Sequence, residues 1–256
     1  MQALETILKD ALEEAGNRAL QLSRTGYKRW TKQDGSPVTE ADLAADEILM
    51  NRLRPALPEA GWQSEESATD VPPQNRFWIV DPIDGTAAFA GGEPGWCVAV
   101  ALIHNGAPEL AGIFAPVSGT FFTAIKGQGA KRDGQVISAS SRPQLEGAHL
   151  IARPAPLAQH NYPPVNRTSL YSIALRLCAV AEGSKDGMLA IGHKQDWDIA
   201  AGDLIVREAG GGASDLAGAP LRFGLAGHKR SGVIAAGAKL HPQMLAHAAQ
   251  AKGTAK

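Results

Sequence analysis

Two carboxylates, Asp81 and Asp84, lie three residues apart in the hexapeptide 81–86, with the sequence DPIDGT. The preceding run, 77–80, is apolar like the interior of a strand, which predicts that the hexapeptide is a turn leaving a buried strand. Asp81, Asp84 and the Ile83 carbonyl can present three hard oxygens to one point, and such ligands suit Mg²⁺. The alternative is a plain strand-ending turn, because turns recruit Asp and Gly for local hydrogen bonding.

Other acidic residues are candidates for the same site. Glu65 and Glu66 are adjacent in a polar segment upstream of the hexapeptide. An acidic pair is usually a solvated surface, but this one precedes the apolar strand, so the fold can bring it alongside. Asp42 follows Thr39 with the spacing of a capping box, which gives it a structural alternative of equal weight. Asp198 is placed to be the N-cap of a helix that closes at residues 210–211.

The elements that must position these carboxylates follow from the periodicity of apolar residues. Helical spacing predicts one helix over 2–24 and another from Thr39 to Leu53, stopping before Pro55. Strands are expected over 77–81, 96–104, 110–115 and 120–125, the last three joined by turns at 105–106 and 118–119 into an antiparallel meander. From about residue 141, strand and helix segments alternate, which indicates a separate α/β layer. These segments are 149–152, 172–183, 187–191, 198–209, 233–236 and 242–252.

Bulk properties exclude several classes of protein. The chain has 256 residues, 44% of them apolar and 20% charged, with a formal net charge of −1. This balance gives no reason to expect a nucleic-acid polymer or a membrane as the main partner. Cys97 and Cys178 lie in apolar segments and are expected to be buried thiols. The amphipathic, acidic first 25 residues and the lack of an apolar run of about 18 residues predict a cytoplasmic protein.

Two separated signatures make a resemblance specific. The pair Glu65-Glu66, the hexapeptide 81–86 and the segment 197–202, WDIAAG, resemble in order, spacing and flanking sequence the inositol monophosphatase superfamily of metal-dependent phosphatases. Residues 35–42 are similar to its loop–helix element, and residues 125–130 to its glycine-containing turn. The resemblance therefore extends over most of the chain.

The resemblance implies a role for each of these residues. Glu65, Asp81, the Ile83 carbonyl, Asp84 and Asp198 would hold two or three Mg²⁺ ions, with Glu66 supporting them or sharing a metal. Glu65 would also be catalytic, together with Thr86 and Asp42, whose hydrogen-bonded pair would orient and deprotonate the attacking water. The backbone N–H groups of Gly85, Thr86 and Ala87 would bind the phosphate at a helix N-terminus.

This chemistry is physically consistent with the residues present. A phosphate monoester repels an anionic nucleophile, and metal ions both neutralise phosphoryl oxygens and lower the pKa of water. Five carboxylates gathered without cations would repel one another, so the cluster needs a metal. Inhibition by lithium is a further expectation from the resemblance.

The substrate is less clearly indicated. Ala87 and Ala88 stand where inositol monophosphatases usually carry Thr-Asn and bisphosphate nucleotidases often carry Lys-Glu. The stretch 191–196 differs from the inositol-binding segment of the family, although Asp196 is a possible substitute for its glutamate. Lys194 is a candidate to bind a second phosphate, or else is a solvated surface lysine, and Asp198 is a further candidate for contact with the substrate. The leading substrate is therefore a 3′(2′),5′-bisphosphate nucleotide, with inositol 1-phosphate and histidinol phosphate as alternatives.

The resemblance also implies the architecture. We expect an α/β (α+β) protein, a layered α/β/α/β/α sandwich of the sugar phosphatase type, assembled as a homodimer. The change to alternating segments separately places a boundary near residue 140, so that a first subdomain, 1–140, would hold an antiparallel sheet and most metal ligands. The second, 141–256, would supply Asp198 and the substrate-specificity loops. Because a fold does not determine a function, a regulatory protein- or RNA-interaction module on this fold is the alternative class.

Overall fold

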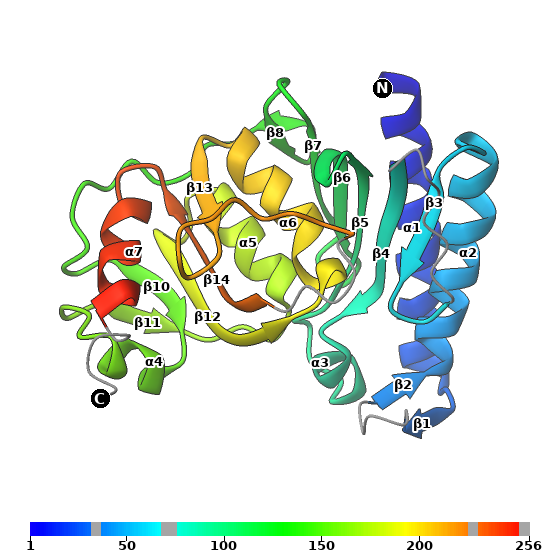
Figure 1. Cartoon of the computed structure of the whole chain (residues 1–256). Helices are drawn as coiled ribbons and strands as arrows, with labels where there is room; N and C mark the ends of the chain where they lie inside the picture. Colours follow the sequence, from blue (N-terminus) through cyan, green and yellow to red (C-terminus); the bar gives the residue numbers. More distant parts are fainter. Residues whose placement is uncertain (32–36, 68–75, 225–229, 251–256) are drawn as a thin grey trace.

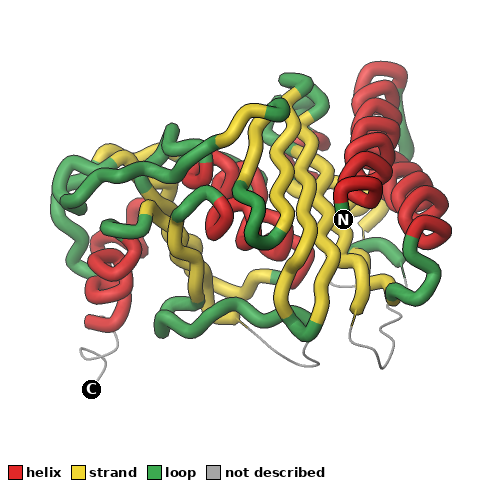
Figure 2. The backbone as a smooth tube through the Cα atoms, turned by 90° about the horizontal axis from the view of Figure 1, so that it is seen from above, coloured by secondary structure: helices red, strands yellow, loops and turns green. Residues whose placement is uncertain are grey.

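Five layers of helix and sheet alternate across the molecule, as predicted (Figure 1). The computed structural model describes residues 1–31, 37–67, 76–224 and 230–250, so Gly35 and Ser36 of the segment 35–42 lie outside the described residues. Figure 2, turned by 90°, shows the same alternation of helices and strands. The α/β (α+β) sandwich expected from the sequence is therefore confirmed.

Two long helices form the first layer. They are α1 (Gln2–Thr25) and α2 (Glu40–Ala56), and each places one apolar stripe against the first sheet. Thr39 caps α2 in a capping box with Asp42, as predicted. The prediction that α2 stops before Pro55 was wrong, because the helix includes Pro55 in its last turn and ends at Ala56. Proline is disfavoured inside a helix, but here the chain leaves the helix directly afterwards.

The second layer is a seven-stranded sheet of order β3-β4-β5-β6-β7-β8-β9. Strands β4 to β7 pair antiparallel in sequence order, so the predicted meander is confirmed. Strand β3, which was not predicted, pairs parallel to β4 at the sheet edge. The strands are β3 (Gly61–Ser64), β4 (Arg76–Asp84), β5 (Cys97–His104), β6 (Ala107–Ala115), β7 (Thr120–Ile125), β8 (Ala130–Arg132) and β9 (Gln135–Val136).

Both faces of this sheet are covered, which explains why its central strands are apolar at almost every position. In β4, Phe77 and Ile79 face the interior of the sandwich, whereas Trp78 and Val80 pack under α1 and α2. Successive strand residues point to opposite faces, so the odd-numbered positions of β4 face the interior up to Asp81. This alternation decides where the carboxylates point.

The middle layer consists of α5 (Ile173–Ala181) and α6 (Asp196–Glu208), confirming two predicted helices. Figure 1 shows them between the two sheets. Their residues join one hydrophobic cluster with side chains from both sheets. The helices are therefore apolar on most sides, as a buried layer requires.

The remaining two layers are a second sheet and its cover. The sheet has the order β11-β10-β12-β14-β13, and α4 and α7 lie on its outer side. Its core strands and α7 match the predicted alternation, whereas β11, β13 and α4 were not predicted. The elements are β10 (His149–Ala152), α4 (Pro154–Gln159), β11 (Asn166–Thr168), β12 (Gly187–Lys194), β13 (Gly211–Ser214), β14 (Arg230–Gly237) and α7 (His241–Gln250).

Two small elements flank the sheets. Strands β1 (Arg29–Thr31) and β2 (Pro37–Thr39) form an antiparallel pair, and the short helix α3 (Thr86–Ala90) follows β4.

Cys97 and Cys178 are buried free thiols, as expected. Among the described residues, no helix is both long enough and apolar enough to cross a membrane.

Candidate metal centre

An irregularity in β4 brings Asp81 and Asp84 to the same side of the sheet. Residues three apart in a regular strand face opposite sides. Here Asp81 pairs with Ala99 and Asp84 with Cys97, so three steps along β4 oppose two along β5. Such a bulge changes the side of the sheet to which a following side chain points, here that of Asp84. Pro82 is tolerated within the bulge because proline has no N–H group to donate to the neighbouring strand. The strand therefore continues through Asp84 instead of ending at Asp81, which corrects the predicted turn.

The edge strand β3 delivers Glu65 to the same point. Ser64 pairs with Val80 in the parallel ladder, and the Glu65 N–H continues it by donating to the Val80 carbonyl at 3.3 Å. Glu65 thus lies next to Asp81. Burial is the main cause that raises the pKa of Asp81, Asp42 and Asp198, and the charge of Glu65 adds a smaller contribution to each.

Asp198 completes the cluster from the middle layer. One carboxylate oxygen from each of Asp81, Asp84 and Asp198 lies within 4.8 Å of the other two. Asp198 was predicted to be an N-cap, but α6 begins at Asp196 with Gln195 as its N-cap, so Asp198 is the third residue of the helix. From there it accepts a hydrogen bond from the Gln195 N–H at 2.9 Å.

Helix α5 fixes Asp84, a role that sequence reasoning missed. The hydroxyl of Ser172, the N-cap of α5, donates to Asp84 Oδ2 at 2.5 Å, and the Ala174 N–H donates to the same oxygen at 2.5 Å. Both of these hydrogen bonds go to Oδ2 of Asp84. A Ser before an apolar helical run signals an N-cap in the sequence, but nothing there connects Ser172 to a residue 88 positions away.

The carboxylates of the centre are hard to ionise together without a cation. Burial and then the charge of Asp84 raise the pKa of Asp198 to about 7. Burial also raises the pKa of Asp84 to about 6, even though the hydrogen bonds from Ser172 and Ala174 lower it. The pKa of Asp81 lies well above its usual range because of burial and then the charge of Asp84.

This donor set fits Mg²⁺. Asp81, Asp84 and Asp198 offer only hard oxygen ligands, and a divalent cation would offset their mutual repulsion. The Ile83 carbonyl lies between the first two in sequence and accepts a hydrogen bond from Thr86 Oγ1 at 3.1 Å. The acidic cluster can therefore bind such an ion.

The expected pair of Thr86 and Asp42 is not hydrogen-bonded in the structure. Thr86 donates to the Ile83 carbonyl, while Asp42 Oδ2 accepts from the Thr39 N–H at 2.7 Å and the Thr39 hydroxyl at 2.5 Å. The capping box therefore engages Oδ2 of the Asp42 carboxylate that was expected to bind Thr86. Asp42 is nonetheless buried near Glu65, and burial raises its pKa to about 6.

The loop after β4 turns sharply into α3. Gly85 is the N-cap of α3, with a φ of 98°, and a Cβ there would lie 2.9 Å from the Gly95 carbonyl oxygen. The N–H groups of Thr86 and Ala87 lie in the first turn of this short helix, where they have no acceptor within the helix. The position of this turn next to Asp84 is compatible with the phosphate-binding role that was expected.

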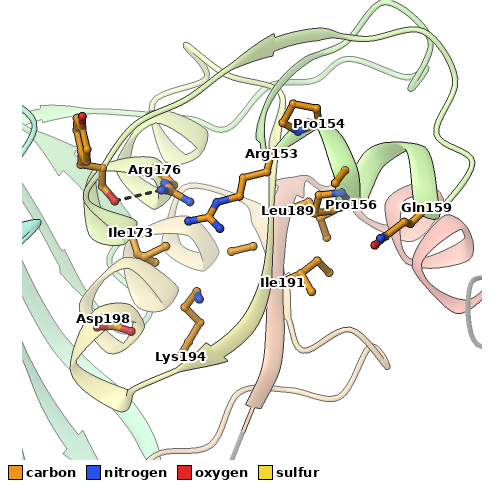
Figure 3. A pocket seen from close by; sticks show the side chains of 13 residues that line it. Arg153, Pro154, Pro156, Gln159, Ile173, Arg176, Leu189, Ile191, Lys194 and Asp198 are labelled. Carbon is orange, nitrogen blue, oxygen red and sulfur yellow. Dashed lines mark hydrogen bonds between the residues drawn. The ribbon is translucent and has the colours of Figure 1, made fainter. Parts of the chain in front are cut away.

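A cavity of about 730 Å³ opens beside Asp198 (Figure 3). Residues of α4, α5, β12 and α6 line it, and Lys194, expected to contact substrate, is one of them. The cavity thus joins the metal centre to the second sheet.

Comparisons with known proteins agree with this geometry. The sequence model described as the inositol monophosphatase family matches residues 1–253. The chain is 34% identical to the Nus factor SuhB of Salmonella typhimurium (strain LT2) over 236 residues, 85% of this chain and 87% of that protein. The corresponding Escherichia coli (strain K12) protein is 33% identical, with the same coverage.

Solved structures share the architecture. The extragenic suppressor protein suhB from Bartonella henselae superposes with a TM-score of 0.86 at 28% identity, covering 96% of this chain and 98% of the other. The Thermotoga maritima IMPase gives a TM-score of 0.85 at 25% identity, with 99% of both chains covered. A match over nearly the whole sequence, joined to the same fold, establishes that the chain belongs to the inositol monophosphatase family.

Proposed function

We propose that the protein is a Mg²⁺-dependent phosphomonoesterase that hydrolyses a small phosphorylated metabolite. The observation that carries this proposal is the convergence of Asp81, Asp84 and Asp198, supplied by two layers of the sandwich, within 4.8 Å. A purely structural role gives no reason to bury three mutually repelling carboxylates at one point. Family membership supports the same conclusion.

Each part of the centre has a proposed role. Asp81, Asp84, Asp198, Glu65 and the Ile83 carbonyl would hold the metal. When bound, Mg²⁺ would neutralise charge on the phosphoryl oxygens and lower the pKa of water. The number of ions, two or three, stays a prediction, as does inhibition by lithium.

Residues around the metal ligands would place the reacting groups. The backbone N–H groups at Gly85, Thr86 and Ala87 would donate to the phosphate, which fixes the phosphorus relative to the acidic cluster. Asp42 and Thr86 would accept the proton of the attacking water, which requires Thr86 to exchange its hydrogen bond to Ile83 for one to Asp42.

The leading substrate is a 3′(2′),5′-bisphosphate nucleotide, with inositol 1-phosphate and histidinol phosphate as alternatives. Lys194, at the wall of the cavity beside Asp198, supports a substrate with a second anionic group. A 730 Å³ cavity also lies in the range of about 300–1,000 Å³ that small-molecule sites occupy.

A phosphate-release assay with Mg²⁺ tests the proposal. The panel is adenosine 3′,5′-bisphosphate, inositol 1-phosphate, histidinol phosphate and fructose 1,6-bisphosphate. We expect Asp84→Asn to lower phosphate release by more than about 100-fold, the upper effect of residues that only support a metal ligand. Asp10→Asn, at an exposed position of α1, is the matched control. Absence of release from every member of the panel would overturn the proposal.

A regulatory protein- or RNA-interaction role is the second candidate. The curated relatives named Nus factor SuhB favour it, because their name describes a factor and not an enzyme. The two candidates separate in cells: if regulation is the main role, Asp84→Asn restores a deletion strain as well as the wild type does, whereas a phosphatase role requires that it fail.

A further inference from the structure

The cavity beside Asp198 is built from four separate elements and is basic on one side. Arg153 stands at the N-cap of α4, Arg176 lies on α5, and Lys194 is the last residue of β12. Figure 3 shows these three side chains directed towards the same part of the cavity, with Asp198 at its edge. Three cations from three elements therefore converge next to the metal centre.

Arg176 is held rigidly in this arrangement. Its Nε donates to the Leu170 carbonyl at 2.8 Å, and one terminal nitrogen donates to the Tyr171 carbonyl at 3.1 Å. Both bonds go to neutral carbonyls, so the positive charge of the guanidinium is not cancelled by them. Lys194 likewise donates to a carbonyl, that of His193, at 2.9 Å. Arg176 and Lys194 are therefore oriented by backbone carbonyls, which do not neutralise their charges.

The charges repel one another across the cavity. Burial lowers the pKa of Lys194, the charge of Asp198 partly offsets this, and the positive charges of Arg176 and Arg153 lower it again. Burial similarly lowers the pKa of Arg176, against the opposing charge of Asp84, and Arg153 adds to the lowering. Within the described ranges, no carboxylate comes within 4.0 Å of a nitrogen of these three side chains. An anion placed among them would relieve this repulsion.

The opposite side of the cavity is mostly apolar, although Gln159 also lines it (Figure 3). Pro156, Leu189 and Ile191 line it, and Ile173 lies between Arg176 and Lys194 (Figure 3). A ligand that fits therefore has an uncharged body against this wall and an anionic group against the cations. Its other end reaches Asp198, where the proposed hydrolysis takes place.

We propose that this cavity binds a second phosphate of a doubly phosphorylated substrate, and that Arg153 and Lys194 are the residues that select it. The inference rests on the proposed function and deepens it: one phosphate lies at the acidic cluster, while the other, which is not hydrolysed, lies among the three cations. Nucleoside bisphosphates and sugar bisphosphates share this chemistry, and the test separates them.

The experiment compares each bisphosphate with its matched monophosphate. With Mg²⁺ present, kcat/KM is measured for adenosine 3′,5′-bisphosphate against adenosine 3′-phosphate, and for fructose 1,6-bisphosphate against fructose 1-phosphate. The pair in which the wild type has the higher kcat/KM for the bisphosphate identifies the substrate class, nucleoside bisphosphate or sugar bisphosphate. The variants are Lys194→Met and Arg153→Gln, with Lys126→Met and Arg167→Gln as controls at exposed positions outside the cavity.

We expect each cavity variant to lower the ratio of bisphosphate to monophosphate kcat/KM by about 10- to 100-fold, as loss of a charge-assisted hydrogen bond does. The loss should appear mainly as a higher KM, because the second phosphate binds equally in ground and transition states. Lys194→Arg should restore most of the ratio, and the two controls should leave it at the wild-type value.

The outcomes are distinguishable. If the wild type releases phosphate from neither member of either pair, nor from inositol 1-phosphate or histidinol phosphate, the proposed function fails. If it releases phosphate only from inositol 1-phosphate or histidinol phosphate, the cavity assignment fails and the phosphatase stands. If it hydrolyses monophosphates and bisphosphates alike, or if Arg153→Gln and Lys194→Met both keep the wild-type ratio, the cavity assignment fails and the phosphatase stands. Arg153 is exposed, so its variant tests the assignment even if Lys194→Met does not fold.

Discussion

At the scale of single residues, the carboxylates of the metal centre oppose folding when no cation is bound. Burial and neighbouring charge raise the pKa of Asp198 to about 7, above the value of about 3.9 for an unfolded aspartate. Between these values the folded state binds more protons than the unfolded state, so stability falls as pH rises through this window. The contribution of Asp198 to the free energy of unfolding is fully present only below the pKa of the unfolded state.

Replacing Asp198 should therefore stabilise the metal-free protein. We expect Asp198→Asn, measured by thermal unfolding in EDTA, to raise Tm at pH 8 by about 2–4 °C, the shift that about 1 kcal/mol gives in a chain of this size. At pH 5 the gain should be smaller, because the wild-type carboxyl is then mostly protonated. Asn can still accept from the Gln195 N–H.

Added Mg²⁺ should reverse the order of the two Tm values, so that the wild type becomes more stable than Asp198→Asn. Ligand binding to the folded state raises Tm, and the variant has lost one ligand. Added Mg²⁺ should thus stabilise the wild type more than Asp198→Asn. A lower Tm for the variant in EDTA at pH 8 would show that Asp198 stabilises the fold by itself.

At the scale of elements, the site depends on how β4 ends. The bulge turns Asp84 to the side of Asp81, and Gly85 then reverses the chain into α3 with a positive φ. Gly95 and Trp96 approach Gly85 so closely that a Cβ would meet backbone atoms at 2.9 and 3.3 Å. Glycine is therefore required at position 85 for two reasons, the positive φ and the lack of room for a Cβ atom.

Substitutions at Gly85 and Gly92, before and after α3, distinguish the effect of positive φ from that of close packing. Gly85 and Gly92 both have positive φ, but a Cβ on Gly92 meets nothing within 4 Å. Gly92→Ala should cost about 1–2 kcal/mol from backbone strain alone. Gly85→Ala should cost more in urea unfolding and should also abolish phosphate release, because the backbone beside Asp84 must shift. Equal losses of stability with retained activity would contradict this account.

The sequence predicts elements better than it predicts their junctions. Apolar periodicity located the long helices and the meander correctly, because packing in layers demands that pattern. It missed short strands such as β3, whose four residues carry too little pattern. It also took 81–86 as a turn, since a bulge depends on the register with β5, and it set Asp198 at the N-cap although the helix begins two residues earlier.

The carboxylates of the candidate metal centre were recognisable from the sequence, but their partners were not. The family signatures single out Asp81, Asp84 and Asp198, which the fold brings together. The bond from Ser172 to Asp84 and the convergence of Arg153 with Lys194 arise from packing between distant segments. The Thr86–Asp42 bond and the subdomain division at residue 140 stay predictions.

At the scale of the whole molecule, the layers share one interior. A single hydrophobic cluster includes side chains from the first sheet, from α5 and α6, and from β12 and β14 of the second sheet. Removing either sheet would expose one side of the middle helices. The two halves of the chain are therefore energetically dependent on each other.

We accordingly expect unfolding in one cooperative step. Hydrogen exchange followed by mass spectrometry along a urea series, with saturating Mg²⁺, should give the same midpoint for peptides from β5 and from β12. Loss of protection in β12 at a lower urea concentration than in β5 would show that the second sheet unfolds separately.

The division of the metal ligands between layers has a consequence for synthesis. Asp81 and Asp84 leave the ribosome more than a hundred residues before Asp198, and Asp198 reaches them only when α6 packs between the sheets. A nascent or truncated chain thus cannot assemble the three-carboxylate site. Competence to bind the metal reports that translation has passed α6 and that its layer is in place.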